Sequence, residues 1–223
     1  NTTGDLNTAV GKDCLAANTT GSLNVAVGAL ALDSNTTGSQ NVAIGLNALN
    51  NNTTASNNTA VGYQSLNGNT AANNTAVGYN SLVSNTSGTR NTAVGSESLD
   101  NNTTANDNTA IGYRTCNDNT TGSALTAVGA FAVHENTTGT NQTGIGYAAL
   151  YSNTTGSHNT AVGLNSSYHN TTGQDNTSMG VNSLRVNTTG TNNTAIGRNA
   201  LEVSTTASNN TAVGSRALLS NTT

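Results

Sequence analysis

The sequence contains no proline and no tryptophan, and only one phenylalanine among its 223 residues. Charged residues make up 7% of the chain, against about 25% in an ordinary globular protein. Disordered chains are usually rich in charge and proline, so this composition does not indicate disorder. Because proline cannot donate to a β-ladder, its absence fits a chain whose amide groups are nearly all paired.

Basic residues are equally sparse: six Lys and Arg are scattered along the chain, and the net charge is −4. This excludes an extended nucleic-acid surface. No apolar stretch is long enough to span a bilayer, and no signal peptide is visible. We therefore expect neither nucleic-acid binding nor membrane insertion in this segment.

A short motif fills the whole chain instead. Asn-Thr-Ala-Val-Gly begins at Asn7, and equivalents recur to give thirteen copies, spaced by 17 residues except for one step of 16 between Asn58 and Asn74. We number the positions of the consensus Asn-Thr-Ala-Val-Gly-x-x-Ala-Leu-x-x-Asn-Thr-Thr-Gly-x-x from one to seventeen, in words. A fixed period of this kind predicts a solenoid. Because residues 1–223 start and stop within a repeat without polar caps, we expect a single array cut from a longer fibre.

The distribution of charge predicts the shape of one coil. Every Lys, Arg, Asp, Glu and His falls at positions six, seven, ten, eleven, sixteen or seventeen. Since charges avoid buried sites, these positions indicate three exposed corners between three uncharged segments. The sequence thus predicts an all-β solenoid (β-helix or β-roll) of thirteen coils. A roughly three-sided coil is its simplest geometry, and the hand is left open.

Two apolar columns are expected to form the core. Position four is always Val, Ile or Met, and position nine is Leu in ten copies. We predict that these residues point inward, with Thr of position two on the same side as position four. They are Val10, Val27, Ile44, Val61, Val77, Val94, Ile111, Val128, Ile145, Val162, Met179, Ile196, Val213, Leu15, Leu32, Leu49, Leu66, Leu82, Leu99, Leu150, Leu184, Leu201 and Leu218.

The other recurrent residues have predictable roles. Gly at position five is invariant, which indicates a turn or backbone conformation closed to other residues. Asn at positions one and twelve is expected to form hydrogen-bonded ladders between coils. Because two aliphatic side chains per coil make a thin core, we also expect the Ala faces of positions three and eight, such as Ala43 and Ala48, to be buried against other chains, most simply in a trimer.

The strings Asn41–Leu49 and Asn193–Leu201 resemble the head repeats of trimeric autotransporter adhesins, and the Asn-Thr-Thr-Gly/Asn-Thr-Ala-Val-Gly arrays of phage tail-fibre-like and bacterial surface proteins. The resemblance covers all thirteen copies, although the adhesin repeat is usually shorter. It implies a left-handed coil, a trimer, and a location outside the cell or on a virion.

Sequons offer one candidate chemistry. Position twelve carries Asn-x-Thr/Ser at Asn1, Asn18, Asn35, Asn52, Asn85, Asn102, Asn119, Asn136, Asn153, Asn170, Asn187 and Asn221. In a secreted glycoprotein, these Asn residues would carry a row of glycans along one edge. Alternatively, they form an inward ladder, and the Asn-x-Thr/Ser pattern is only a by-product of the composition. The repeat itself does not separate the two interpretations.

Binding surfaces are the alternative. Tyr63, Tyr79, Tyr113 and Tyr147 share position six, so they form candidate contacts for a carbohydrate or host receptor, or they simply pack over adjacent coils. Columns of Thr could order water as in an ice-binding face, but adjacent residues such as Thr19 and Thr20 point to opposite sides of a strand.

Enzyme and metal chemistry is not indicated, because acids and histidines do not recur at ligand or catalytic spacing. Cys14 and Cys116 lie six coils apart, too far for a disulfide, and each replaces a small or apolar inward residue. We therefore predict a non-enzymatic structural protein without cofactors. It would form the shaft or head of an extracellular, adhesin-like filament, with itself as partner in a trimer or end to end; the alternative is a surface-binding module for carbohydrate, receptor or ice.

Overall fold

The computed structural model describes residues 1–221, which contain thirteen strands of three residues each. They form two compact units, Asn1–Asn108 and the part from Thr109 onward. In unit 1 the strands are β1 (Thr8–Val10), β2 (Val25–Val27), β3 (Val42–Ile44), β4 (Thr59–Val61), β5 (Thr75–Val77) and β6 (Thr92–Val94). In unit 2 they are β7 (Thr109–Ile111), β8 (Thr126–Val128), β9 (Thr143–Ile145), β10 (Thr160–Val162), β11 (Thr177–Met179), β12 (Thr194–Ile196) and β13 (Thr211–Val213).

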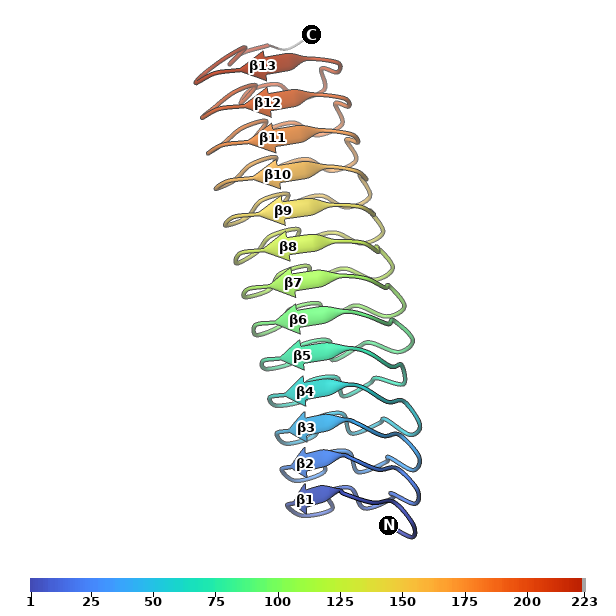
Figure 1. Cartoon of the computed structure of the whole chain (residues 1–223). Coiled ribbons are helices and arrows are strands. Elements are labelled where there is room, and N and C mark those ends of the chain that lie inside the picture. Colours follow the sequence, from blue (N-terminus) through green and yellow to red (C-terminus); the bar gives the residue numbers. More distant parts are fainter. Residues whose placement is uncertain (222–223) are drawn as a thin grey trace. The chain divides into compact units, whose positions relative to one another are not determined.

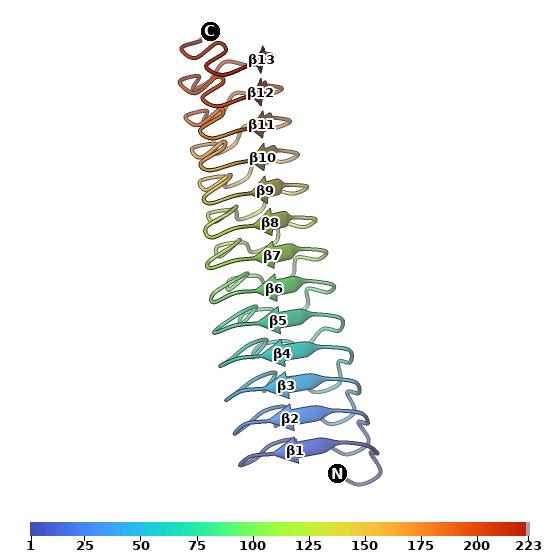
Figure 2. The same cartoon turned by 60° about the vertical axis from the view of Figure 1, so that its left-hand side comes forward.

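Within each unit, every strand pairs in parallel with its sequence neighbour, one coil above the last (Figures 1 and 2). The register is one repeat: Val42, Ala43 and Ile44 lie beside Thr59, Ala60 and Val61. This stacking places equivalent positions of successive repeats in columns. The prediction of an all-β solenoid of stacked 17-residue coils is therefore confirmed, with one strand per coil at positions two to four.

The rest of each coil is a series of turns rather than further strands. Positions seven, nine and seventeen have positive φ in every coil, for example Asn47 (58°), Leu49 (52°) and Asn57 (62°). Backbone hydrogen bonds between coils nevertheless continue outside the strands, since Leu32 N donates to Ala48 O at 3.1 Å and Thr36 N to Thr53 O at 2.8 Å. The residues with positive φ thus turn the chain without interrupting the backbone hydrogen bonds between coils.

The inward residue of β2–β13 is that of position three, which is Ala except for Gly144 and Ser178, and not the Val, Ile or Met of position four. Ala43 is fully buried, whereas Ile44 is 39% exposed. The position-four column is half-buried or exposed throughout, so its assignment to the core is wrong for Val10, Val27, Ile44, Val61, Val77, Val94, Ile111, Val128, Ile145, Val162, Met179, Ile196 and Val213. Positions two and four do share a face, as strand alternation requires, but it is the outer one.

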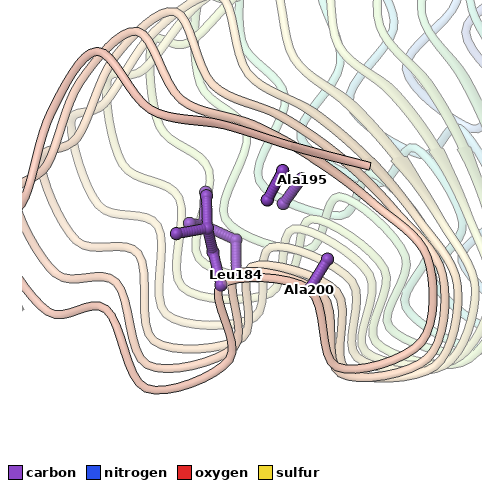
Figure 3. Packing of buried hydrophobic residues seen from close by; sticks show 5 residues of the cluster. Leu184, Ala195 and Ala200 are labelled. Carbon is purple, nitrogen blue, oxygen red and sulfur yellow. The ribbon is translucent and has the colours of Figure 1, made fainter. Parts of the chain in front are cut away.

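The Leu column is confirmed as core. Leu184 and Leu201 are buried in one cluster with Ala195 and Ala200, and the labelled Leu184, Ala195 and Ala200 lie inside the coils in Figure 3. The other Leu residues of the column are buried as well. The terminal Leu218 departs from this pattern at 49% exposed. Small residues at positions three and eight leave the interior just wide enough for one Leu per coil. Ala43 and Ala48 are buried in this interior, so the prediction that they face other chains is wrong.

The invariant Gly of position five has the predicted role. Gly62 has φ of 132°, and a Cβ there would lie 2.4 Å from the carbonyl oxygen of Gly78 in the next coil. Neither the backbone angle nor the space allows another residue.

Both predicted Asn ladders are present and buried. Asn35 Nδ2 donates to Asn18 Oδ1 and to Gly38 O, each at 2.9 Å. In the other column, Asn24 Nδ2 donates to the same Gly38 O at 2.9 Å, while its Oδ1 accepts from Asn41 N at 3.0 Å. The position-fifteen carbonyl therefore joins the two Asn columns, which satisfies polar groups that the narrow core would otherwise leave unpaired.

Candidate functional site

The position-twelve Asn residues are inside the coils. Ten of the twelve sequon residues are 0–1% exposed: Asn18, Asn35, Asn52, Asn85, Asn102, Asn119, Asn136, Asn153, Asn170 and Asn187. An N-glycan is attached through Nδ2, the atom that donates within the ladder, for example from Asn136 to Asn119 Oδ1 at 2.8 Å. The prediction of a glycan row is therefore wrong for these ten residues, because the folded coil has no room for a sugar there. Asn1 is exposed and Asn221 half-buried, both in terminal coils.

The solvent-facing side of the strands is a repetitive surface formed by positions two and four of each coil, and we call it the outer face. It presents Thr at position two, except for Val25 and Val42, beside the Val, Ile or Met column. Exposure is substantial within the array, at 40% for Ile111 and 44% for Met179. No charged residue stands at either position. The arrangement is thus an uncharged strip with an apolar column on one side and a mostly hydroxyl-bearing column on the other.

Two of the four candidate tyrosines form an isolated pair in unit 1. The rings of Tyr63 and Tyr79 lie on adjacent coils with centroids 5.4 Å apart and planes at 10°. They are 41% and 50% exposed. Because the facing sides of the rings cover each other, only one outer face of each ring is free to stack on a sugar.

The other two candidates belong to a larger aromatic cluster in unit 2. Its centre is Phe131, whose ring lies edge-on to Tyr113 at 5.3 Å, His134 at 5.5 Å and Tyr147 at 5.9 Å between centroids. His134 and Phe131 also adjoin Tyr151, with centroids 5.0 Å and 6.3 Å away. We call the following set the aromatic cluster: Tyr113, Phe131, His134, Tyr147, Tyr151, Tyr168 and His169.

The cluster spans two corners that the sequence keeps apart. Phe131 stands at position seven and His134 at position ten, and the intervening turn folds both onto one surface. His134 Nδ1 contacts the carbonyl oxygen of Arg114 in the preceding coil at 3.0 Å. The sequence-based candidates for contact were the position-six tyrosines, whereas the structure adds Phe131 and the residues of the second corner. The missed signal was the chain's only Phe, placed between the coils of Tyr113 and Tyr147.

The coils beneath the cluster depart from the repeat. Leu125 and Gln142 replace Asn at position one, Val133 replaces Leu, and Gly144 replaces Ala. Leu125 and Val133 are fully buried. Gln142 Nε2 donates to Gly156 O as Asn does elsewhere, but its Oε1 is buried without a hydrogen-bond partner, so the position-one ladder is interrupted here. The core residues therefore depart from the repeat consensus in the coils that carry the aromatic cluster, the only large aromatic surface within residues 1–221.

The cluster carries few charges. Burial raises the pKa of the Tyr151 phenol, and the neighbouring Glu135 carboxylate acts in the same direction. The guanidinium of Arg114 lies 5.4 Å from the ring centroid of Tyr113, within cation–π range. The cluster is thus apolar in its body, with tyrosine hydroxyls and a few ions at its edge.

The two cysteines lie in different units. Cys116 is fully buried, as expected for an inward replacement, and burial raises the pKa of its thiol well above the usual range. Cys14 is half-buried, and its Sγ contacts Ala26 O at 3.0 Å.

Residues 1–221 contain no cavity that could hold a ligand and no cluster of three or more His, Cys, Asp or Glu that could hold a metal. Over the same residues, no helix is long and apolar enough to cross a membrane. Comparisons with models of protein families, with curated proteins and with solved structures give no match.

Proposed function

We propose that the chain is a non-enzymatic structural element of an extracellular fibre, on a cell surface or a virion, and that it assembles with copies of itself through the outer face. One observation carries this proposal: each unit exposes an unbroken column of Val, Ile or Met side chains with no charge beside it. The occupant is a second copy of the chain.

The dimensions of the face support association. At about 3.3 Å per residue and about 4.8 Å per strand, three-residue strands make a strip roughly 10 Å wide and, over the seven strands of unit 2, roughly 34 Å long. The strip is comparable in area with the largest surface patches of monomeric proteins, about 300–600 Å², which are often functional. Because each coil repeats at the same spacing, two copies would meet the same chemistry at every coil.

The placement of charge supports the same function. All Lys, Arg, Asp, Glu and His side chains lie at the corner positions, where they favour solubility without interrupting the strand face. Ladders that run from coil to coil, such as the Asn35–Asn18 contact, join successive coils within a unit, as a structural role requires.

Sedimentation velocity tests the proposal. The chain should sediment as an oligomer, and as a trimer if the resemblance to adhesin heads extends to assembly. Ile44→Lys with Val61→Lys and Val77→Lys should give a folded monomer, because three ammonium groups would have to be buried in the interface. The matched control is Leu46→Lys: Leu46 is 44% exposed, but it stands at the first corner. A wild-type chain that is a folded monomer at every concentration would refute assembly through this face.

A surface-binding function is the second candidate. The aromatic cluster favours carbohydrate or receptor binding, and the columns of Thr and Val on the outer face favour ordering of water at an ice surface. Affinity electrophoresis in gels containing neutral polysaccharides, with Tyr147→Ala as the variant, tests the first. Thermal hysteresis of a monomeric chain, abolished by Thr59→Lys with Thr75→Lys, tests the second.

A further inference from the structure

Four of the six tyrosines are arranged as stacked pairs on adjacent coils. Tyr151 and Tyr168 have ring centroids 4.9 Å apart and planes at 3°. Tyr63 and Tyr79 have the corresponding values of 5.4 Å and 10°. Each pair occupies one position of successive repeats, position ten in the first case and position six in the second, so the strand register holds the two rings together.

Adjacent coils are otherwise joined only by chain continuity and non-covalent contacts. Both cysteines are free thiols, in different units, and Cys116 is buried. No lysine lies in either tyrosine pair, since the only lysine is Lys12. The stacked tyrosines are therefore the groups best placed for a covalent link between coils.

We propose that Tyr63 with Tyr79, and Tyr151 with Tyr168, are sites of oxidative coupling that staple neighbouring coils as dityrosine. The oxidant is hydrogen peroxide used by a haem peroxidase. Each phenol loses one electron and one proton to become a phenoxyl radical. The two radicals join by a carbon–carbon bond between the ring carbons ortho to oxygen. The hydrogen on each of these carbons then moves to the oxygen and restores both phenols. In total, two tyrosines and one H₂O₂ give one dityrosine and two H₂O.

The geometry favours coupling within a pair over coupling between chains. The ring centroids of the two pairs are 5.4 Å and 4.9 Å apart, so rotation of these partly exposed side chains can bring two ortho carbons together without displacement of a coil. Proximity of this kind converts a bimolecular step into an intramolecular one. Since Tyr63 and Tyr79 are 41% and 50% exposed, they should react first. Tyr151 and Tyr168 are half-buried and should follow more slowly.

The proposal is tested by treating the purified chain with a haem peroxidase and hydrogen peroxide, followed by tryptic digestion and mass spectrometry. Trypsin cleaves after Lys12, Arg90, Arg114 and Arg185, so peptide 13–90 holds the first pair, and peptide 115–185 holds the second pair together with Tyr147. Each peptide should lose the mass of two hydrogen atoms, and fragmentation should place the link between the paired tyrosines. Tyr79→Phe should abolish the loss in peptide 13–90 only, and Tyr168→Phe that in peptide 115–185 only.

Tyr113→Phe is the matched control, because Tyr113 adjoins Phe131 rather than a tyrosine ring. Both intramolecular links should persist in this variant. In denaturant, the links within each pair should give way to links between different peptides. Three results would overturn the proposal: no link in the folded chain, a loss of two hydrogens in peptide 13–90 that survives Tyr79→Phe, or equal yields in the folded and denatured chain. None of these readouts depends on the oligomeric state, so the test is separate from that of the fibre function.

Discussion

Val133 and Gly144 face each other inside unit 2, where a Cβ on Gly144 would come 2.6 Å from Cγ2 of Val133. Elsewhere position nine is usually Leu and position three usually Ala. The branched Val133 side chain fills the space that the Cβ of position three normally occupies, so the two substitutions compensate each other. Both residues belong to the coils that carry the aromatic cluster, so the departures from the repeat consensus in the core and on the surface occur in the same coils.

This pairing predicts a coupled effect on stability. Gly144→Ala should lower the free energy of unfolding by about 1–3 kcal/mol, because the added methyl group overpacks the interior. In a Val133→Leu background, which restores the usual residue, the same substitution should cost less. A double-mutant cycle from urea denaturation measures the difference. Strictly additive effects would contradict direct packing between the two side chains.

The Gly residues of position five and those of position fifteen should differ in their tolerance of substitution by alanine. Gly62→Ala should be strongly destabilising, since φ is 132° and the carbonyl oxygen of Gly78 lies 2.4 Å from the new Cβ. Gly38→Ala is the control. Its Cβ would lie 2.3 Å from Ala55 O, yet Ala55, Ala105 and Ala207 already occupy the same position, so the backbone there adjusts. Similar melting temperatures for the two variants would contradict this distinction.

The buried Asn ladder should be sensitive to charge. Asn136 Nδ2 donates to Asn119 Oδ1 and to Gly139 O, so Asn136→Asp places a carboxylate against two acceptors. Burial should raise the pKa of that carboxyl above its unfolded value. The variant should therefore be least destabilised at a pH below the pKa that this carboxyl has in the unfolded chain. The destabilisation should increase as the pH rises through the pKa of the carboxyl in the folded chain.

The measurement is the urea midpoint at several pH values, with Asn136→Ala as a variant that lacks the titrating group. Asn136→Ala should cost about 1–3 kcal/mol for the lost hydrogen bonds, with no added pH dependence. Parallel pH profiles for the two variants would show that the site is not buried.

The cysteines should report local opening. Burial raises the pKa of both thiols, most strongly for Cys116, which lowers the fraction of reactive thiolate at any pH below those values. Iodoacetamide should label the half-buried Cys14 before Cys116 in the folded chain. In urea the two rates should converge. Equal rates without denaturant would mean that the coil around Cys116 opens freely.

Much of the architecture was predictable from Asn41–Leu49 and its copies. A fixed period places like residues in columns whatever the detailed path of the coil, so the solenoid, the inward Leu49, the turning Gly45 and the Asn41 ladder all follow from repetition. Charge confined to certain positions likewise identifies the corners, because burying an unpaired charge is costly at any site.

The side on which Ile44 points was decided only by the tertiary structure. Hydrophobicity favours Ile44 over Ala43 for the core, and strand alternation requires that the two point to opposite sides. The coil is too narrow for Ile, Leu and two Asn columns together, so the smaller Ala43 turns inward and Ile44 outward. The same constraint buries the Asn of each sequon. Sequence determined the period and the columns. Interior volume, which depends on how tightly the turns close, determined which columns form the core and which form the surface.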